Sequence, residues 1–366
     1  ILPKKEQFYN KDIELPDYDF FSTNSMNDAK ELADIYYKNN YQEVEAKAGM
    51  HPGTFKVFVN FIPVADITQL DTTIFKNLKK DSLIRENIFY APPNYLRMSM
   101  YLELSRPDGD VSRWEKVLKR LLLLNKNFPL EGIECSSYNF DKEFKGIDDK
   151  EKLFTIIRSI AQKKNLVFFG GYSLSLYSKY NNNFKSNNTP DFDLLSNEPF
   201  ETAKFIKEEL KKYFENILIV YHSNIGENIP FHYEIKLNNN SIAFIYKTDA
   251  CYNYNNIKIN NKIYRIATID TLLSFYLAFY YSNRKYYDKN RILCIAEYLF
   301  KIQKKYKYKQ SGVIKRFVPT CYGKQKSIEE IRREKNVKYN LLKTHKKSKD
   351  YEYNFLKYNP NFSETP

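Results

Sequence analysis

Two aspartates separated by one residue, Asp191 and Asp193, are the side chains of this sequence best suited to chemistry. In a β-strand, residues i and i+2 point to the same face, with their Cα atoms roughly 6.5 Å apart. Two carboxylates so placed can bridge two Mg²⁺ ions roughly 3.5–4 Å apart, the spacing used for in-line phosphoryl transfer. The pair therefore predicts metal-dependent transfer of a phosphoryl or nucleotidyl group, with Phe192 turned the other way into a core.

A second motif lies upstream of the aspartates. The apolar run at residues 166–169 is followed by Gly170 and Gly171, and apolar residues at helical spacing begin at Tyr172. A strand, a glycine turn and a helix start present backbone N–H groups to phosphates. We expect the N–H groups of Gly170 and Gly171, with the Ser173 hydroxyl, to hold the β- and γ-phosphates of a nucleotide. Ser173 could equally cap the helix, and the two roles are compatible.

Hydrophobic periodicity predicts an α+β fold, in which helices flank a mixed sheet. Near the N-terminus it predicts a helix at residues 25–41 and one buried strand at residues 55–64. Around the motif it predicts helices at residues 149–164, 201–214, 270–281 and 289–306, with strands at residues 217–221, 232–237 and 242–246. We divide the chain into an N-terminal α+β domain (1–135), a catalytic domain (136–300) and a basic C-terminal segment (301–366).

The motifs carry a family resemblance. GGYSLSL at residues 170–176, followed by DFDLL at residues 191–195, resembles the catalytic subunit of poxvirus poly(A) polymerase and its giant-virus relatives. Residues 94–104 and 113–126 look like the upstream region of the same enzymes. The resemblance implies a nucleotidyltransferase-type sheet in residues 136–300, preceded by a degenerate nucleotidyltransferase-like domain.

The same resemblance implies an activity and its setting. It predicts addition of AMP from ATP to mRNA 3′ ends with two Mg²⁺ or Mn²⁺ ions, in the cytoplasm, at a viral factory or in the virion. The partners it implies are an RNA 3′ end and ATP, with either a second copy of the chain or a viral processivity subunit. Two alternatives stay open: another enzyme of the nucleotidyltransferase superfamily, and a non-catalytic RNA-binding or processivity subunit.

The family's third carboxylate has no obvious counterpart. Its expected place, in the strand after a β-hairpin, reads Ile242-Ala243-Phe244. A two-residue turn at Asn238-Asn239 would set Glu234 across from Ala243 and on the same face. Glu234 is therefore one candidate for the third catalytic and metal-binding carboxylate. Asp249 is a second candidate, but it lies about 6 residues beyond Ala243, roughly 20 Å along a straight strand. The third possibility is that neither residue completes the site.

Positive charge is concentrated late in the chain. Of a net charge of +14, residues 301–350 supply 17 Lys/Arg against 4 Asp/Glu, a net +13. Aromatic residues are interleaved with these cations: Tyr306, Tyr308, Phe317, Tyr322 and Tyr339. Phosphate neutralisation with base stacking is typical of a single-stranded nucleic-acid track, so we expect this segment to bind RNA rather than to be only a solvated basic tail.

The cysteines and the hydropathy exclude other classes. Cys135, Cys251, Cys294 and Cys321 lie far apart and form no C-x-x-C motif, which argues against structural zinc and predicts reduced thiols in a reducing compartment. No apolar stretch is long enough to span a bilayer, so no membrane partner is expected.

Overall fold

The computed structural model describes residues 2–7, 17–135, 144–177, 191–284, 287–306 and 314–362. The chain forms two compact units. Unit 1 combines Ile1–Lys76 with Lys326–Pro366, and unit 2 comprises Asn77–Gln325. The three segments expected from the sequence do not match these units, because both expected boundaries fall inside unit 2. Tyr308, one of the aromatics of the basic segment, lies outside the described residues.

Unit 1 is built on a five-stranded sheet with the order β1-β4-β3-β2-β15. Strands β1 and β4 are parallel and the other neighbours are antiparallel. Alternate residues of β2, β3 and β4 form a core with α1, which includes Phe55, Val57 and Ala29. The bounds are η1 Lys4–Glu6, β1 Tyr18–Ser22, α1 Ser25–Lys38, β2 Val44–Ala48, β3 Thr54–Val59, β4 Ile62–Gln69 and β15 Lys357–Tyr358.

One expectation in this unit is wrong. Residues 55–64 are not one strand, because Asn60 and Phe61 adopt positive φ and reverse the chain between β3 and β4. Asparagine tolerates the left-handed region through local hydrogen bonding of its short side chain, which makes the turn accessible.

The C-terminal part of the basic segment folds onto the N-terminal sheet of unit 1. Helix α10 (Ile328–Leu342) begins with a capping box at Ser327, and α11 (Lys349–Phe355) follows. Leu356 enters the core and the Tyr353 ring meets Phe55 edge-on at 5.7 Å. Strand β15 then pairs with β2, and η6 (Pro360–Phe362) follows it. Residues 326–362 are therefore a structural part of unit 1.

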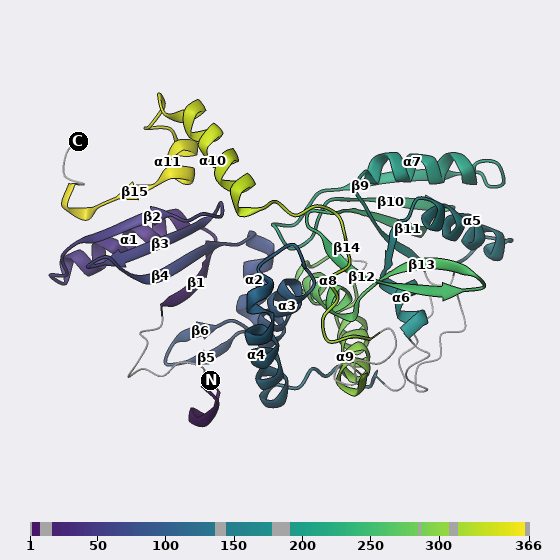
Figure 1. Ribbon diagram of the computed structural model, residues 1–366, viewed down its shortest axis with the longest axis horizontal. Coiled ribbons are helices and arrows are strands. Elements are labelled where there is room, and N and C mark those ends of the chain that lie inside the picture. Colours follow the sequence, from purple (N-terminus) through teal and green to yellow (C-terminus); the bar gives the residue numbers. More distant parts are fainter. Residues whose placement is uncertain are drawn as a thin grey trace. The chain divides into compact units, whose positions relative to one another are not determined.

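Unit 2 contains an eight-stranded sheet with the order β14-β12-β13-β7-β8-β11-β10-β9. In Figure 1, α7 covers one face of this sheet and the green helix α8 lies on the other. The strands are β5 Leu83–Arg85, β6 Ile88–Tyr90, β7 Val167–Phe169, β8 Phe192–Ser196, β9 Ile217–His222, β10 His232–Leu237, β11 Asn240–Lys247, β12 Tyr252–Ile259, β13 Lys262–Ala267 and β14 Cys321–Tyr322. The helices are α2 Thr72–Asp81, which crosses the boundary between units, α3 Pro93–Leu104, η2 Val111–Arg113, α4 Trp114–Asn127, α5 Lys150–Lys163, α6 Gly170–Tyr177, α7 Pro199–Leu210, α8 Ile269–Tyr281 and α9 Lys289–Tyr306.

The cysteines of unit 2 are paired, contrary to the expected reduced thiols. Cys135 is bonded to Cys294, and Cys251 to Cys321. The second bond fastens β14 beside the start of β12. The partners are 159 and 70 residues apart in sequence, and spacing alone cannot reveal a pairing that the sheet topology creates.

The two units repeat one topology. In unit 1 the path β1-α1-β2-β3-β4 gives the strand order β1-β4-β3-β2, and in unit 2 the path β8-α7-β9-β10-β11 gives β8-β11-β10-β9. In both units the first strand is parallel to the last, and the other two pairings are antiparallel. Strand β1 thus corresponds to β8, and β4 to β11.

The repeat extends to sequence and hydrogen bonds. PDYDFFS at residues 16–22 aligns without a gap with PDFDLLS at residues 190–196. The hydroxyl of Ser22 accepts the Asn24 N–H at 2.7 Å, and that of Ser196 accepts the Glu198 N–H at 3.1 Å. Each serine thus ends its strand and turns the chain into α1 or α7. Residues 17 and 19 therefore correspond to residues 191 and 193.

Candidate functional site: two carboxylate rows

In unit 2 the structure brings the two motifs found in the sequence together. Strands β7 and β8 are antiparallel neighbours, and Phe169 is the direct partner of Asp193. Gly170 follows with φ +65°, and a Cβ placed there would lie 1.8 Å from Asp193 Oδ2. The Asp193 carboxylate thus lies directly over the start of α6, where only glycine fits.

Ser173 lies in the first turn of α6. Its hydroxyl is completely buried and has no hydrogen-bond partner among the described residues, whereas the nearby Ser175 donates to the Tyr172 carbonyl at 2.7 Å. Tyr276 of α8 is buried, and burial and then the negative charges of Asp193 and Asp191 raise the pKa of its hydroxyl. Its hydroxyl is therefore neutral at physiological pH and can donate a hydrogen bond.

The expected register of Glu234 is wrong by one residue. The turn at Asn238-Asn239 forms as expected, but a bulge follows between Ile235 and Lys236, so that Glu234 pairs with Phe244 rather than Ala243. Phe244 in turn pairs with Asp193 across β11 and β8. Asp193, Phe244 and Glu234 therefore form one row on one face of the sheet, with the phenyl ring in the middle.

Glu234 is committed to other partners. Its carboxylate lies 2.9 Å from His222 Nε2 and 3.6 Å from Lys236 Nζ, and it accepts a hydrogen bond from Ser241. Burial raises its pKa, but the hydrogen bonds from Ser241 and His222 and the Lys236 charge outweigh this, so the pKa of Glu234 lies below its usual value. One strand, β11, lies between Glu234 and Asp193, so their Cα atoms are two inter-strand spacings apart, roughly 9.5 Å.

Asp249 is placed still less favourably for metal binding with Asp193. It follows the end of β11, whereas Asp193 pairs with Phe244 five positions earlier on that strand. Its carboxylate accepts a hydrogen bond from Tyr252 at 2.5 Å and lies 3.9 Å from Arg106. The structure therefore does not bring Asp249 to Asp191 and Asp193.

Unit 1 contains the equivalent row, and here the carboxylates are complete. Asp17 precedes β1, Asp19 lies within it, and Asp19 pairs directly with Asp66 of β4. Directly paired residues project from the same face, so Asp17, Asp19 and Asp66 share one face of the sheet. Lys56 of β3 pairs with Asp66 and contacts its two oxygens at 2.8 and 2.6 Å.

The two rows differ at two positions. Where unit 1 has Asp66 and Lys56, unit 2 has Phe244 and Glu234. Oxygen donors of this kind suit Mg²⁺ and Mn²⁺, so the trio of unit 1 fits a divalent cation better than the pair of unit 2. Among the described residues, the carboxylate oxygens of neither row form a group of three within 4.8 Å of one another. The one group of three ligand atoms within 4.8 Å of one another is Asp108 with Cys251 and Cys321, whose sulfurs are bonded to each other.

Sequence reasoning missed Asp17, Asp19 and Asp66. The repeated strings PDYDFFS and PDFDLLS were the signal that could have revealed the first two. Asp66 follows from the register of β1 and β4, which no sequence pattern states.

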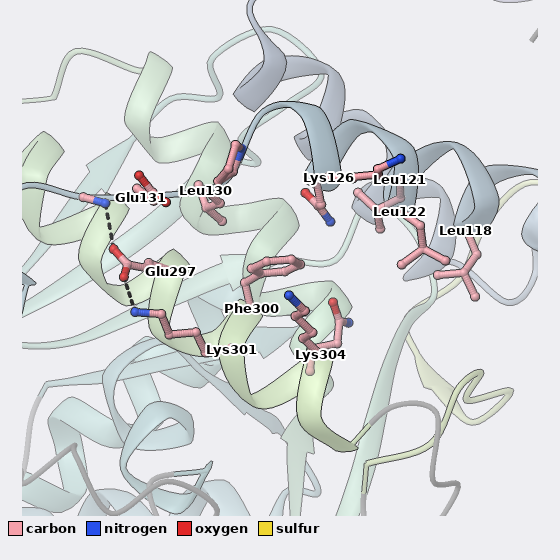
Figure 2. A pocket seen from close by; sticks show the side chains of 14 residues that line it. Leu118, Leu121, Leu122, Lys126, Leu130, Glu131, Glu297, Phe300, Lys301 and Lys304 are labelled. Carbon is pink, nitrogen blue, oxygen red and sulfur yellow. Dashed lines mark hydrogen bonds and ion pairs between the residues drawn. The ribbon is translucent and has the colours of Figure 1, made fainter. Parts of the chain in front are cut away.

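Unit 2 also has a pocket of about 810 Å³ between α4 and α9. Figure 2 shows Leu118, Leu121 and Leu122 on one side, with Phe300 in the middle. At one end Glu297 accepts the Gly132 N–H at 2.8 Å and pairs with Lys301. Its lining includes none of the glycines, serine or aspartates of the unit 2 row, so the pocket is a separate feature.

Comparisons with known proteins support the resemblance. The model of the family described as poly(A) polymerase catalytic subunit matches residues 1–110. The poly(A) polymerase catalytic subunit of African swine fever virus is 33% identical over 137 residues, covering 36% of this chain and 28% of that protein. The mimivirus protein of the same name is 24% identical over 282 residues, covering 77% of this chain and 43% of its own length. The chain therefore spans less than half the length of these relatives.

A solved structure has the same fold. The Megavirus polyadenylate synthase superposes with a TM-score of 0.80 at 20% identity, covering 99% of this chain and 74% of that one. The expected nucleotidyltransferase-type fold, with mixed sheets flanked by helices, is thus confirmed. So is the expected resemblance of this chain to the poly(A) polymerase catalytic subunits of large DNA viruses.

Proposed function

We propose that this chain adds AMP from ATP to RNA 3′ ends without a template, and that Asp17, Asp19 and Asp66 are its catalytic carboxylates. One observation carries this proposal. The complete row, with Asp19 paired to Asp66, lies within the residues that match the family model of the catalytic subunit. Polyadenylation as such is what the relatives' names describe.

The three aspartates of this row would act by binding divalent cations. Two divalent cations, when bound, would activate the primer 3′ hydroxyl and stabilise the charge on the triphosphate. Asp17 and Asp19, two residues apart, would bind from one strand and Asp66 from the neighbouring strand. The carboxylates are exposed or half-buried, so a large substrate can reach this face.

The assignment from sequence remains a rival proposal. In it Asp191 and Asp193, with Glu234 or without a third ligand, perform the transfer, and Gly170, Gly171 and Ser173 hold the phosphates. The non-catalytic alternative also rests on that row, because Phe244 stands where the third carboxylate is needed. The complete row of unit 1 removes this difficulty.

A primer-extension assay with the full-length protein separates these proposals. An oligo(A) primer is incubated with each of the four NTPs and Mg²⁺ or Mn²⁺, using wild type, Asp19→Asn and Asp193→Asn. We expect ATP to be used best and Asp19→Asn to lose transfer, while Asp193→Asn stays within about tenfold of wild type. Loss in Asp193→Asn alone would establish the rival site. No extension by wild type with any NTP would support the non-catalytic subunit.

We propose mRNA as the substrate and either a second copy or a viral processivity subunit as the partner. We propose that the protein acts in the cytoplasm, at a viral factory, or in the virion; of these, the virion is where the two disulfides would persist. No helix among the described residues is long and apolar enough to cross a membrane.

A further inference from the structure

We propose that unit 2 contains a second, non-catalytic site for a metal-bound polyphosphate at the start of α6. This inference rests on the proposed function, which assigns transfer to the row of unit 1. The ligand chemistry is a phosphate chain carrying a divalent cation, supplied by a nucleoside triphosphate or by the phosphates of an RNA strand.

The hydroxyl of Ser173 lies at the start of α6. A buried polar group without a partner is destabilising, and this hydroxyl is fully buried without one among the described residues. Side chains in a helix lean toward its N-terminus, and the first N–H groups of a helix have no partner within it. The Ser173 hydroxyl and these N–H groups therefore belong to the same end of α6, an arrangement that suits a phosphate oxygen.

The Asp193 carboxylate comes close to this end of α6. It occupies the space above Gly170 where any Cβ would clash. A carboxylate beside a helix N-terminus would repel a bare phosphate, but a divalent cation bound by Asp193 and Asp191 removes the repulsion. The site is therefore suited to a phosphate chain that brings its cation with it.

This site would bind without transfer. Phe244 is 6% exposed and fills the position that Asp66 has in unit 1. Glu234, beyond it, is held by His222, Ser241 and Lys236. The site keeps the phosphate-binding groups and one pair of carboxylates but lacks the ligand that completes a two-cation centre.

The test counts bound nucleotides on the full-length protein. Equilibrium dialysis uses Mg²⁺ and an ATP analogue with a methylene group between the α- and β-phosphates. We expect two nucleotides per wild-type chain. Ser173→Ala should lower the affinity of one site roughly tenfold or more, the usual effect of losing a hydrogen bond to a charged group. Ser175→Ala is the matched control on the same helix, and it should keep both sites.

Asp193→Asn tests the same site independently. A second arm adds oligo(A) ending in a 3′-phosphate. Displacement of only the nucleotide that Ser173→Ala weakens would identify RNA phosphate as the occupant, and no displacement would identify the free nucleotide. The inference is overturned if wild type binds one nucleotide that Asp19→Asn removes, or if Ser173→Ala and Asp193→Asn leave both affinities unchanged. Failure of the proposed function is a separate result, since it requires Asp19→Asn to retain AMP transfer.

Discussion

Replacing Asp66 with asparagine is the sharpest test of the unit 1 row. The change keeps the size of the side chain and removes only its charge. In the folded protein, Asp66 forms an ion pair with Lys56; the Asp66 side chain is 19% exposed and the Lys56 side chain is 38% exposed. Pairs this accessible contribute about 0.2–1 kcal/mol, so the free energy of unfolding should fall by no more than about 1 kcal/mol.

The expected effect on catalysis is much larger. Metal ligation contributes several kcal/mol of charge stabilisation in the transition state. At 1.36 kcal/mol for each tenfold in rate, a loss of about 3 kcal/mol slows transfer by roughly 100-fold or more. The assay is the initial rate of AMP incorporation into oligo(A) at saturating ATP, with the thermal unfolding midpoint measured on the same samples.

Lys56→Gln is the matched control. It breaks the same ion pair but leaves the carboxylate in place, so it should lower the unfolding midpoint as much as Asp66→Asn does. Its rate should stay within about tenfold of wild type. If Asp66→Asn transfers AMP within threefold of wild type, or if both variants lose activity equally, Asp66 is not a metal ligand and the reasoning from register is refuted.

Three further outcomes follow from the structure. Burial lowers the pKa of His232 from 6.5 to about 4. Between these pH values the unfolded chain is protonated at His232 and the folded chain is not, so the free energy of unfolding should fall by about 3 kcal/mol as pH drops from 6.5 to 4. Urea titrations across this pH range should show a weaker pH dependence for His232→Asn. Removing the Cys251–Cys321 bond by a Cys251→Ser, Cys321→Ser double change should lower the unfolding free energy by about 2–4 kcal/mol; an unchanged denaturation midpoint would show that the bond contributes nothing. Replacing Lys346 and Lys347, both exposed, with glutamine should reduce the salt dependence of RNA binding by about 0.7 in log–log slope for each phosphate that is no longer neutralised, and an identical slope would exclude them from the RNA track.

Local patterns in the sequence predicted local structure well. The strand, glycines and helix around Gly170 are present, and helices α5, α8 and α9 lie within a few residues of their expected bounds. Each of these depends on periodicity and turn chemistry within one stretch of chain. The helix expected at residues 270–281 begins one residue earlier, because Thr268 caps it, and Asp270 is buried and accepts a hydrogen bond from Gln303 at 2.7 Å.

Long-range pairing was not predictable in the same way. The aromatics of the basic segment include Phe317, which packs against Trp114 at 5.2 Å, and Tyr339, which packs edge-on against Phe355 at 5.3 Å. Their spacing among lysines is typical of an RNA track, yet each ring packs against another aromatic ring of the fold. The spacing of residues within one segment shows only which residues are neighbours in sequence. The contact between Phe317 and Trp114 joins two segments that are far apart in the sequence.

The two carboxylate rows show why motif completeness can mislead. In unit 2 the glycines and the aspartate pair lie in one stretch of sequence, so the motif is legible although its third carboxylate is replaced by Phe244. In unit 1 the described residues contain the aspartates without such a glycine turn, and the third carboxylate becomes visible only through the pairing of β1 with β4. Tyr18 and Phe20 on β1 are 63% and 44% exposed, while their unit 2 counterparts Phe192 and Leu194 are fully buried. In unit 2, β7 pairs with β8 and the Tyr172 ring of α6 lies 5.3 Å from that of Phe192, so a strand and a glycine-led helix cover the side chains whose counterparts on β1 are exposed.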